Sequence, residues 1–442
     1  MNQRRVWVST LIFFLLPVFQ ASGVAITLTI EEAVQRALDE SINLKKGAID
    51  LAQAGYSANR LWSEIFPGFS LSAGMTFLPS TSLITEPGFS YRDDDLSYSL
   101  NLGLSLSLNP SLSSSMRRIE LAYRSQLLSY DQAARQLETQ VIKNFLGLIN
   151  IKENIAFMQE RLDLALQNLN QDRIAWEHGL LNELNWLNIQ LSVQTARYNL
   201  IMAQGAYQIA LENFLALLGM ETGTEVNFDG TVNIVPVLYD PEQLILTYLY
   251  QRPDIISRHQ AIERMELTRN VTAHSSRSPS LNLSTQWRGA SGPGALSAPM
   301  SDNITGTVTL NFPIDSWIPG TRQSQNIRAA DAEVEKARLD LQDTEIQAKT
   351  QIRSLVLNLH NTLESLEIAR MRVDVAERTV HATEDGFRNG TVQYRELEQV
   401  RNDLSDARQR FLNEELSYQS LLLDLAAALN VDWRILTRSN TP

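Results

Sequence analysis

The sequence contains no cysteine among its 442 residues. Disulfide bonds, thiolate metal sites and cysteine nucleophiles are therefore excluded together. Basic residues are also comparatively few, with 38 Lys and Arg against 50 Asp and Glu, which gives a net charge of −12. Because phosphate binding needs clustered Lys and Arg, this balance predicts no nucleic acid partner.

Recognisable catalytic and ligand-binding motifs are absent too. The histidines show no metal-ligand spacing, so we interpret them as structural or solvated. Three closely spaced glycines, Gly289, Gly292 and Gly294, fall between two predicted strands, whereas a phosphate-binding loop would need a following helix. Turn glycines explain them better. The sequence thus predicts no enzyme, no cofactor and no metal site. The histidines are His178, His259, His274, His360 and His381.

Long apolar runs are limited to the N-terminus. Arg4 and Arg5 precede an apolar run from Val6 to Phe19, and small residues follow it. This order is typical of a secretory signal peptide, which we place at residues 1–23. The alternative is an uncleaved anchor helix, but the run is shorter than the roughly 20 residues of a span, and Pro17 would kink it.

Internal repetition organises the rest of the chain. Four landmarks recur in the same order at an offset of about 211 positions, which indicates a tandem duplication. We predict one structural repeat at residues 24–239, a second at 240–432 and a C-terminal tail at 433–442. The four pairs are Ile30–Val34 with Pro241–Ile245, Phe66–Leu71 with Ser278–Leu281, His178–Leu180 with Asn389–Thr391, and Leu215–Gly219 with Leu425–Asn430.

Each repeat is predicted to contain two strands and three helices, one of them very long. The three-four spacing of apolar residues that is typical of coiled coils continues through both long helices. At about 1.5 Å per residue each long helix would span on the order of 100 Å, and two shorter helices placed end to end would match it. A cylindrical arrangement of helices can accommodate helices of this length. The predicted helices are 29–65, 111–177 and 184–218, then 240–276, 320–387 and 394–430.

The strand pairs alternate between apolar and small polar residues. We predict the pairs at 69–78 with 96–108 and at 280–288 with 304–313. Their polar positions carry mainly Ser, Thr, Asn and Gly, whereas solvated faces of soluble sheets usually carry Lys and Glu. A membrane β-barrel with a polar lumen explains this better than a half-buried soluble sheet. Because four strands cannot close a barrel and lipid tolerates no open edge, several chains must share one barrel.

With these features the chain resembles the TolC family of outer-membrane efflux and secretion channels over essentially its whole mature length. The family's Arg-Pro-Asp element is matched by Arg252–Ile255, and its Phe-Pro…Gly stretch by Phe312–Ile314 with Gly320. The aromatic-x-x-Gly turn is matched by Phe387–Thr391. The resemblance implies an α+β membrane protein in the outer membrane. Its duplicated coiled coils would form a periplasmic α-barrel, and its four strands would join a homotrimeric barrel of twelve strands in outer-membrane lipid.

The resemblance also implies partners and site residues. A periplasmic adaptor would connect the channel to an inner-membrane transporter, for efflux or for type I secretion. The adaptor would dock at two helix tips, which by resemblance are Gly179, Leu180 and Leu181, and Gly390, Thr391 and Val392. Glycine suits such turns because they often need positive φ. The plain alternative is that these are structural turns.

The family's gate is an acidic ring just after the second tip. Glu396 is the matching position, whereas two further acids of the family correspond to the amides Gln399 and Asn185. This gate should therefore hold fewer charges than the family's fullest version. The plain alternative is that Glu396 is a solvated carboxylate paired with a nearby Arg.

Two other functional classes fit the sequence less well than a channel does. A periplasmic coiled-coil structural or adaptor protein would lack strands such as residues 96–108, with their alternating Leu and Ser. An envelope enzyme would need converging polar groups, and the sequence shows none.

Overall fold

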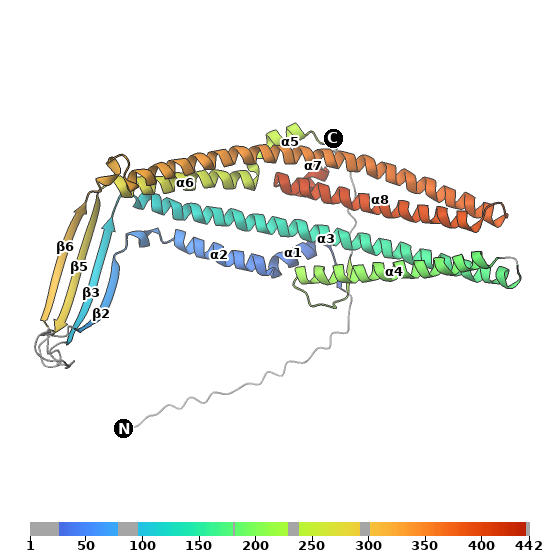
Figure 1. Cartoon of the computed structure of the whole chain (residues 1–442), viewed down its shortest axis with the longest axis horizontal. Helices are drawn as coiled ribbons and strands as arrows, with labels where there is room; N and C mark the ends of the chain where they lie inside the picture. Colours follow the sequence, from blue (N-terminus) through green and yellow to red (C-terminus); the bar gives the residue numbers. More distant parts are fainter. Residues whose placement is uncertain (1–25, 78–95, 180–181, 229–237, 292–300, 439–442) are drawn as a thin grey trace, which may run out of the picture. The chain divides into compact units, whose positions relative to one another are not determined.

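The computed structural model describes residues 26–77, 96–179, 182–228, 238–291 and 301–438 (Figure 1). They form two compact units, which we describe separately. Unit 1 contains the described residues of Met1–Glu40 and Asn144–Asn233, and unit 2 those of Ser41–Lys143 and Ile234–Pro442. The predicted signal peptide at 1–23 lies outside the described residues.

Unit 1 is a helical hairpin with a small β-structure beside it. Helix α1 (Ile30–Glu40), helix α4 (Glu183–Leu217) and the second half of α3 (Leu112–Glu177) provide the helices. Strands β1 (Ile26–Leu28) and β4 (Val226–Phe228) pair in parallel. Three phenylalanines, Phe145, Phe214 and Phe228, meet edge to face with ring centroids 5.3–6.3 Å apart. This aromatic cluster joins α3, α4 and β4 in one core.

The α3–α4 hairpin has the coiled-coil seam that its sequence predicts. Leu162 of α3 is buried against Val193, Ala196 and Leu200 of α4. Ile155, Met158, Ala165 and Leu169 of α3, which follow the three-four spacing, pack against this group. The seam therefore lies where the three-four spacing of apolar residues placed it.

Unit 2 contains a four-stranded antiparallel sheet in the order β2-β3-β5-β6. The strands are β2 (Gly68–Phe77), β3 (Leu96–Leu108), β5 (Ser280–Ser291) and β6 (Ser301–Asn311). Each repeat thus supplies one hairpin, and β3 and β5 join the hairpins. Leu102 pairs with Leu71 on one side and Trp287 on the other, so apolar residues face one side of the sheet in every strand.

The helices of unit 2 include a long rod beside a rod made of two pieces. Helix α7 (Arg322–Arg388) runs for 67 residues, with α6 (Pro253–Arg277) packed along its first half and α8 (Tyr394–Leu429) along its second (Figure 1). The two shorter helices meet end to end, where the amide of Asn430 donates to the carbonyl of Gln251 at 3.3 Å. The arrangement agrees with the predicted match of helix lengths.

The prediction of a single helix at 29–65, and of another at 240–276, was wrong. The first is interrupted after Glu40 because Ser41 caps a new helix by accepting from the Leu44 N–H. The second is interrupted at Pro253, which lacks an N–H and so starts α6. The pieces are α2 (Ile42–Ala58) with the 3₁₀ turn Leu61–Ile65, and α5 (Pro241–Tyr248) with the 3₁₀ turn Leu249–Gln251.

The Arg252–Asp254 motif anchors this second interruption. The Arg252 side chain is buried and donates to both carboxylate oxygens of Asp254, at 3.0 and 2.7 Å, and to Gln351 of α7 at 2.8 Å. Burial raises the pKa of Asp254, but the hydrogen bonds and charge of Arg252 outweigh it and bring that pKa below its usual value. The motif therefore fixes the start of α6 against α7.

A mainly apolar cluster surrounds the junction of α5, α7 and α8. Ile352, Val356 and Leu359 of α7 are buried against Leu422 and Leu425 of α8. The short helix α9 (Trp433–Arg438) adds the buried Leu436, whose carbonyl accepts from the Tyr239 hydroxyl at 2.8 Å. None of the described helices combines the length and the apolar character needed to cross a membrane.

Candidate functional site

The four-stranded sheet presents two chemically different faces. On the apolar face large side chains are open, with Leu71 and Val308 each 72 % exposed. On the opposite face, which we call the polar face, the described residues are almost all small and uncharged. They include Gly68, Ser70, Ser72, Gly74 and Thr76 of β2; Ser99, Asn101, Gly103, Ser105 and Ser107 of β3; Ser280, Asn282, Ser284, Gln286, Arg288 and Ala290 of β5; and Asn303, Thr305, Thr307, Thr309 and Asn311 of β6.

The edges of this sheet are open within the chain. Strands β2 and β6 each pair on one side only among the described residues. An open edge beside an exposed apolar face is not stable in water and is not tolerated in lipid, where every backbone group must be satisfied. The described sheet therefore leaves the outer backbone groups of β2 and β6 without a strand partner.

The second tip is built around two glycines. Gly390 has φ +73°, and its N–H donates to the carbonyl of Phe387 at 3.0 Å. The carbonyl of Gly386 accepts from the N–H groups of Thr391 and Val392, at 2.9 and 3.3 Å. A Cβ on Gly386 would lie 2.6 Å from a methyl of Val392, so this glycine allows the close approach. The sequence identified Gly390 but not Gly386. The requirement for glycine at Gly386 comes from its contact with Val392, which exists only in the folded turn.

The first tip has the same conformation at its glycine. Gly179 has φ +73° and donates to the carbonyl of Trp176 at 2.9 Å, which confirms the expectation of positive φ at both tip glycines. Leu180 and Leu181, the other predicted docking residues of this tip, lie outside the described residues. Helix α4 restarts at the capping residue Asn182, whose side chain accepts from the N–H of Asn185 at 2.8 Å.

The predicted gate residues lie at the starts of α4 and α8. Glu396 is exposed in the first turn of α8, and no described residue forms an ion pair with it. Gln399 lies one turn later and donates to Asp403 at 2.9 Å. Asn185 is half-buried in the first turn of α4, which belongs to unit 1. The structure thus brings Glu396 and Gln399 together on one helix.

Two ion pairs between α7 and α8 were missed by the sequence reasoning. Arg401 of α8 binds Glu384 of α7 at 2.8 Å, and Arg408 binds Glu377 at 2.7 Å. The arginines are seven residues apart, as are the glutamates, so the heptad spacing of opposite charges was a usable signal. Arg401 is mostly buried, with 18 % of its side chain exposed, and it also binds Glu398 at 3.3 Å. We call these contacts the charged clamp.

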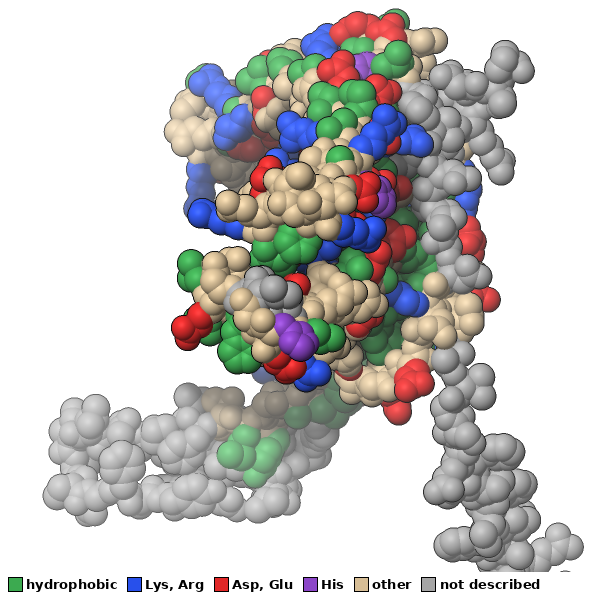
Figure 2. Space-filling model, turned by 90° about the vertical axis from the view of Figure 1, so that its right-hand side faces the viewer, with side chains coloured by type: hydrophobic (Ala, Val, Ile, Leu, Met, Phe, Trp, Pro, Cys, Tyr) green, Lys and Arg blue, Asp and Glu red, His purple; other side chains and the backbone are tan. Residues whose placement is uncertain are grey.

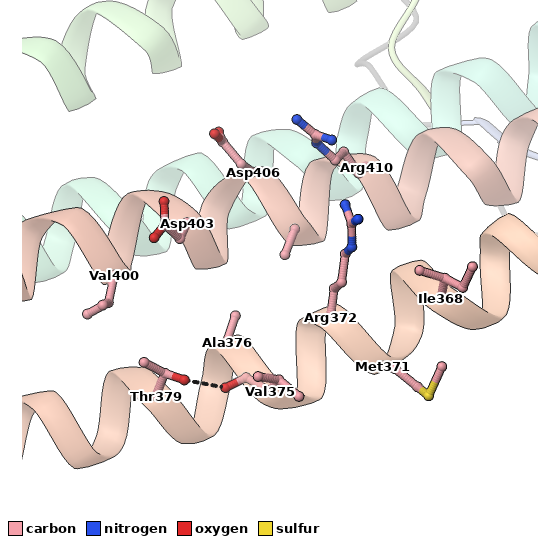
Figure 3. Close-up of a pocket in the computed structure, with 11 residues that line it drawn as sticks. Ile368, Met371, Arg372, Val375, Ala376, Thr379, Val400, Asp403, Asp406 and Arg410 are labelled. Atoms are coloured by element: carbon pink, nitrogen blue, oxygen red, sulfur yellow. Dashed lines mark hydrogen bonds between the residues drawn. The ribbon is translucent and has the colours of Figure 1, made fainter.

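A groove of about 610 Å³ opens between α7 and α8 next to the charged clamp. Its floor includes Val375 and Ala376, while Asp403, Asp406 and Arg410 of α8 stand along one rim (Figure 3). On the face that Figure 2 shows, acidic and basic side chains are interspersed, with hydrophobic side chains between them. Within the described residues, no group of three His, Cys, Asp or Glu side chains is arranged to hold a metal ion.

Comparisons with known proteins agree with this geometry. The chain is 22% identical over 349 residues to an uncharacterized protein of Haemophilus influenzae, covering 75% of this chain and 74% of the other. It is similar in structure to the CmeC outer membrane channel of Campylobacter jejuni, with a TM-score of 0.72 and 18% identity over 90% of this chain and 85% of that one.

Two further solved structures are similar along nearly the whole chain. The outer membrane protein VceC of Vibrio cholerae matches with a TM-score of 0.73 and 15% identity, covering 91% of this chain and 96% of that one. The MtrE outer membrane channel of Neisseria gonorrhoeae, in its open state, matches with a TM-score of 0.70 and 14% identity over 91% and 89%.

The family comparison matches the two halves of the chain separately. The model of the outer membrane efflux protein family matches residues 33–220 and again residues 244–431, once in each half. The two matches together cover most of the sequence, and they carry the tips and the strand pairs described above. The chain therefore belongs to the outer membrane efflux protein family, the family of TolC-like outer-membrane channels.

Proposed function

We propose that this chain is one of three identical subunits of an outer-membrane efflux channel. The three sheets close into one barrel of twelve strands, with the apolar faces toward lipid and the polar faces around the lumen. The helices extend into the periplasm as a tunnel. Substrates move passively from an inner-membrane transporter and its adaptor to the exterior, and the chain itself catalyses no reaction.

The observation that carries this proposal is the sheet with two open edges and one exposed apolar face. Closing the edges with copies of the same sheet satisfies every backbone group of β2 and β6, which lipid requires. It also places Leu71 and Val308 where their exposure is favourable. A half-buried soluble sheet would need the chain's own helices to cover this face, and the described helices leave it open.

The test is the size of the detergent-extracted protein, measured by light scattering with the detergent contribution subtracted. We expect a mass of three chains. A matched variant with Val308→Asp, on the apolar face, should lose membrane insertion, whereas Thr307→Asp, on the polar face, should retain it. A monodisperse monomer that is soluble without detergent would refute the barrel.

We further propose that the helix tips dock a periplasmic adaptor. Gly179 and Gly390 both have left-handed backbone, and the second hairpin ends in a short turn where Thr391 and Gln393 are exposed. The groove beside the charged clamp continues along the same hairpin and offers an apolar floor with charged rims. Efflux, rather than type I secretion, is favoured by the family whose model the chain matches.

Docking is tested by photo-crosslinking in cells that contain the partner adaptor. A photoreactive residue at Thr391 should capture the adaptor, and so should one at His178 of the first tip. The control is the same residue at Ser284 on the polar face of the sheet. Capture at Ser284 but at neither tip would show that the tips are only structural turns.

The gate proposal concerns Glu396. Three copies around the channel axis would crowd like charges, attract cations and disfavour the ionisation of all three carboxylates at once. Its exposure and the absence of an ion pair to any described residue support this role over that of a paired surface carboxylate. In planar bilayers, Glu396→Gln should weaken cation preference and block by divalent cations from the tip side. Gln399→Ala should change neither.

A further inference from the structure

The polar face of the sheet carries one charge among its described residues. Arg288 of β5 is exposed on this face, in register with Asn101 of β3 and Asn303 of β6. All other described residues of that face are uncharged. A sheet face exposed to solvent usually carries several charges of both signs, so a face with a single arginine is unusual.

Nothing described around Arg288 neutralises its charge. Its cross-strand neighbours are amides, and Gln286, two residues earlier, donates to Asn101 at 3.5 Å. The nearest acidic residue along β6 is Asp302, which is in register with Gly289. Successive residues of a strand alternate between faces, so Asp302 lies on the face opposite to Arg288. No described residue forms an ion pair with Arg288.

We propose that Arg288 is a specificity-determining residue that makes the barrel lumen favour anions. This inference rests on the proposed trimer, because three copies related by symmetry lie at one height and form a ring. Rings of Arg or Lys select anions in pores, as rings of carboxylates select cations. The solutes it favours carry carboxylate, phosphate or sulfate groups.

The ring is electrostatically independent of the proposed gate. Helix α7 separates the sheet from the second tip by 67 residues, which span about 100 Å at 1.5 Å per residue. The Debye length is about 10 Å at 0.1 M salt, so the charges of Arg288 and Glu396 do not sense each other. The channel would therefore contain two separate charge filters of opposite sign.

The experiment measures the reversal potential of the reconstituted trimer in a KCl gradient, for wild type and three variants. Arg288→Gln should lower the ratio of chloride to potassium permeability by at least about twofold, a modest part of the roughly tenfold or larger concentration effects of charged clefts. Arg288→Glu should lower it further. Arg288→Lys should retain the wild-type ratio because it keeps the charge.

Two controls identify the origin of any change. The effect should shrink when the gradient is centred near 1 M, where the Debye length falls to about 3 Å. The double variant that combines Arg288→Gln with Glu396→Gln should shift the reversal potential by the sum of the shifts in the two single variants. Absence of any conductance in the wild type would refute the channel itself. A conducting Arg288→Glu trimer with the wild-type permeability ratio would refute the ring alone.

Discussion

The two helical hairpins share their backbone geometry but not their side-chain contacts. The tip glycines Gly179 and Gly390 have the same φ of +73°, and the returning helices end at Gly219 and Asn430 with φ of +66° and +59°. In both, the residue after this cap donates to a carbonyl five residues earlier. The duplicated backbone has been kept at each turn.

The contacts that hold each hairpin have diverged. The α3–α4 hairpin has an apolar seam and a stacked pair of indoles, Trp176 and Trp186, with centroids 5.3 Å apart. The α7–α8 hairpin adds the charged clamp, and its aromatic pair Phe387 and Tyr394 meets edge to face at 6.0 Å. At the positions corresponding to Arg401 and Glu384 the first repeat has Gln190 and Arg173, which cannot form the same pair. We therefore expect salt to weaken the α7–α8 hairpin more than the α3–α4 hairpin.

The largest expected effect is a loss of stability in the α3–α4 hairpin when its apolar seam is disrupted. Leu200→Ala removes a side chain that is 6 % exposed and leaves a cavity in the seam. We expect the local opening free energy of α4 to fall by about 2–5 kcal/mol. Hydrogen–deuterium exchange of α4 amides in the full-length protein measures this. The loss should be equal at 0.1 M and 1 M NaCl; a strong salt dependence would contradict the comparison.

The charged clamp should be the next most sensitive element. Arg401→Gln leaves Glu384 and Glu398 without their common partner, at side-chain exposures of only 25 and 21 %. Because hydrogen bonds to charged groups contribute about 1.5–3 kcal/mol, we expect a loss near 2 kcal/mol in the opening free energy of α8. Gln190→Ala in the first hairpin is the matched control. An equal loss in Gln190→Ala, or no loss in Arg401→Gln, would show that the charged clamp does not distinguish the two hairpins.

A third change tests what the hairpins share. Gly390→Ala and Gly179→Ala both force a Cβ into left-handed backbone, at a cost of roughly 1–2 kcal/mol each. Hydrogen exchange at the two tips should show similar losses for the two variants. Gly386→Ala should affect only the second tip, because its Cβ meets Val392 and the first repeat already has alanine at the corresponding position, Ala175. Unequal losses at Gly179 and Gly390 would show that the turns are not equivalent.

Periodicity predicted the parts of the fold that repeat. The seam around Leu162 and the alternation of β3 follow directly from spacings of three-four and two, and the turn at Gly390 follows from its residue type. The interruptions at Ser41 and Pro253 were missed, although a capping serine and a proline were visible, because the apolar pattern continues through both. The partner of Arg401 was missed because heptad spacing of opposite charges, although it indicates such pairs, also occurs on solvated helix faces.

The helices at the start of each repeat, α1 and α5, also differ in their side-chain contacts. In α1, Thr29 and Glu32 cap each other, with the Thr29 N–H donating to the carboxylate at 3.0 Å and the Glu32 N–H donating to the hydroxyl at 3.3 Å. In α5, Asp240 is the cap, and Glu242 instead accepts from Arg353 of α7 at 2.7 Å. The contact of the first repeat is local, and that of the second joins two helices.

The smallest expected effect follows from these two carboxylates. Hydrogen bonds from Thr29 lower the pKa of Glu32, and the hydrogen bond and charge of Arg353 lower the pKa of Glu242. A lowered pKa in the folded state means that each contribution is present above the unfolded value, about 4.3, and is lost as the pH falls through the folded value. Arg353→Gln should therefore raise the pKa of Glu242 and loosen α5, measured by exchange of its amides between pH 7 and pH 4, while α1 stays unchanged. Because Glu242 is exposed, 1 M NaCl should imitate this variant at α5 but not at α1. Equal salt sensitivity at both helices would mean that the two repeats are held by the same kind of contact.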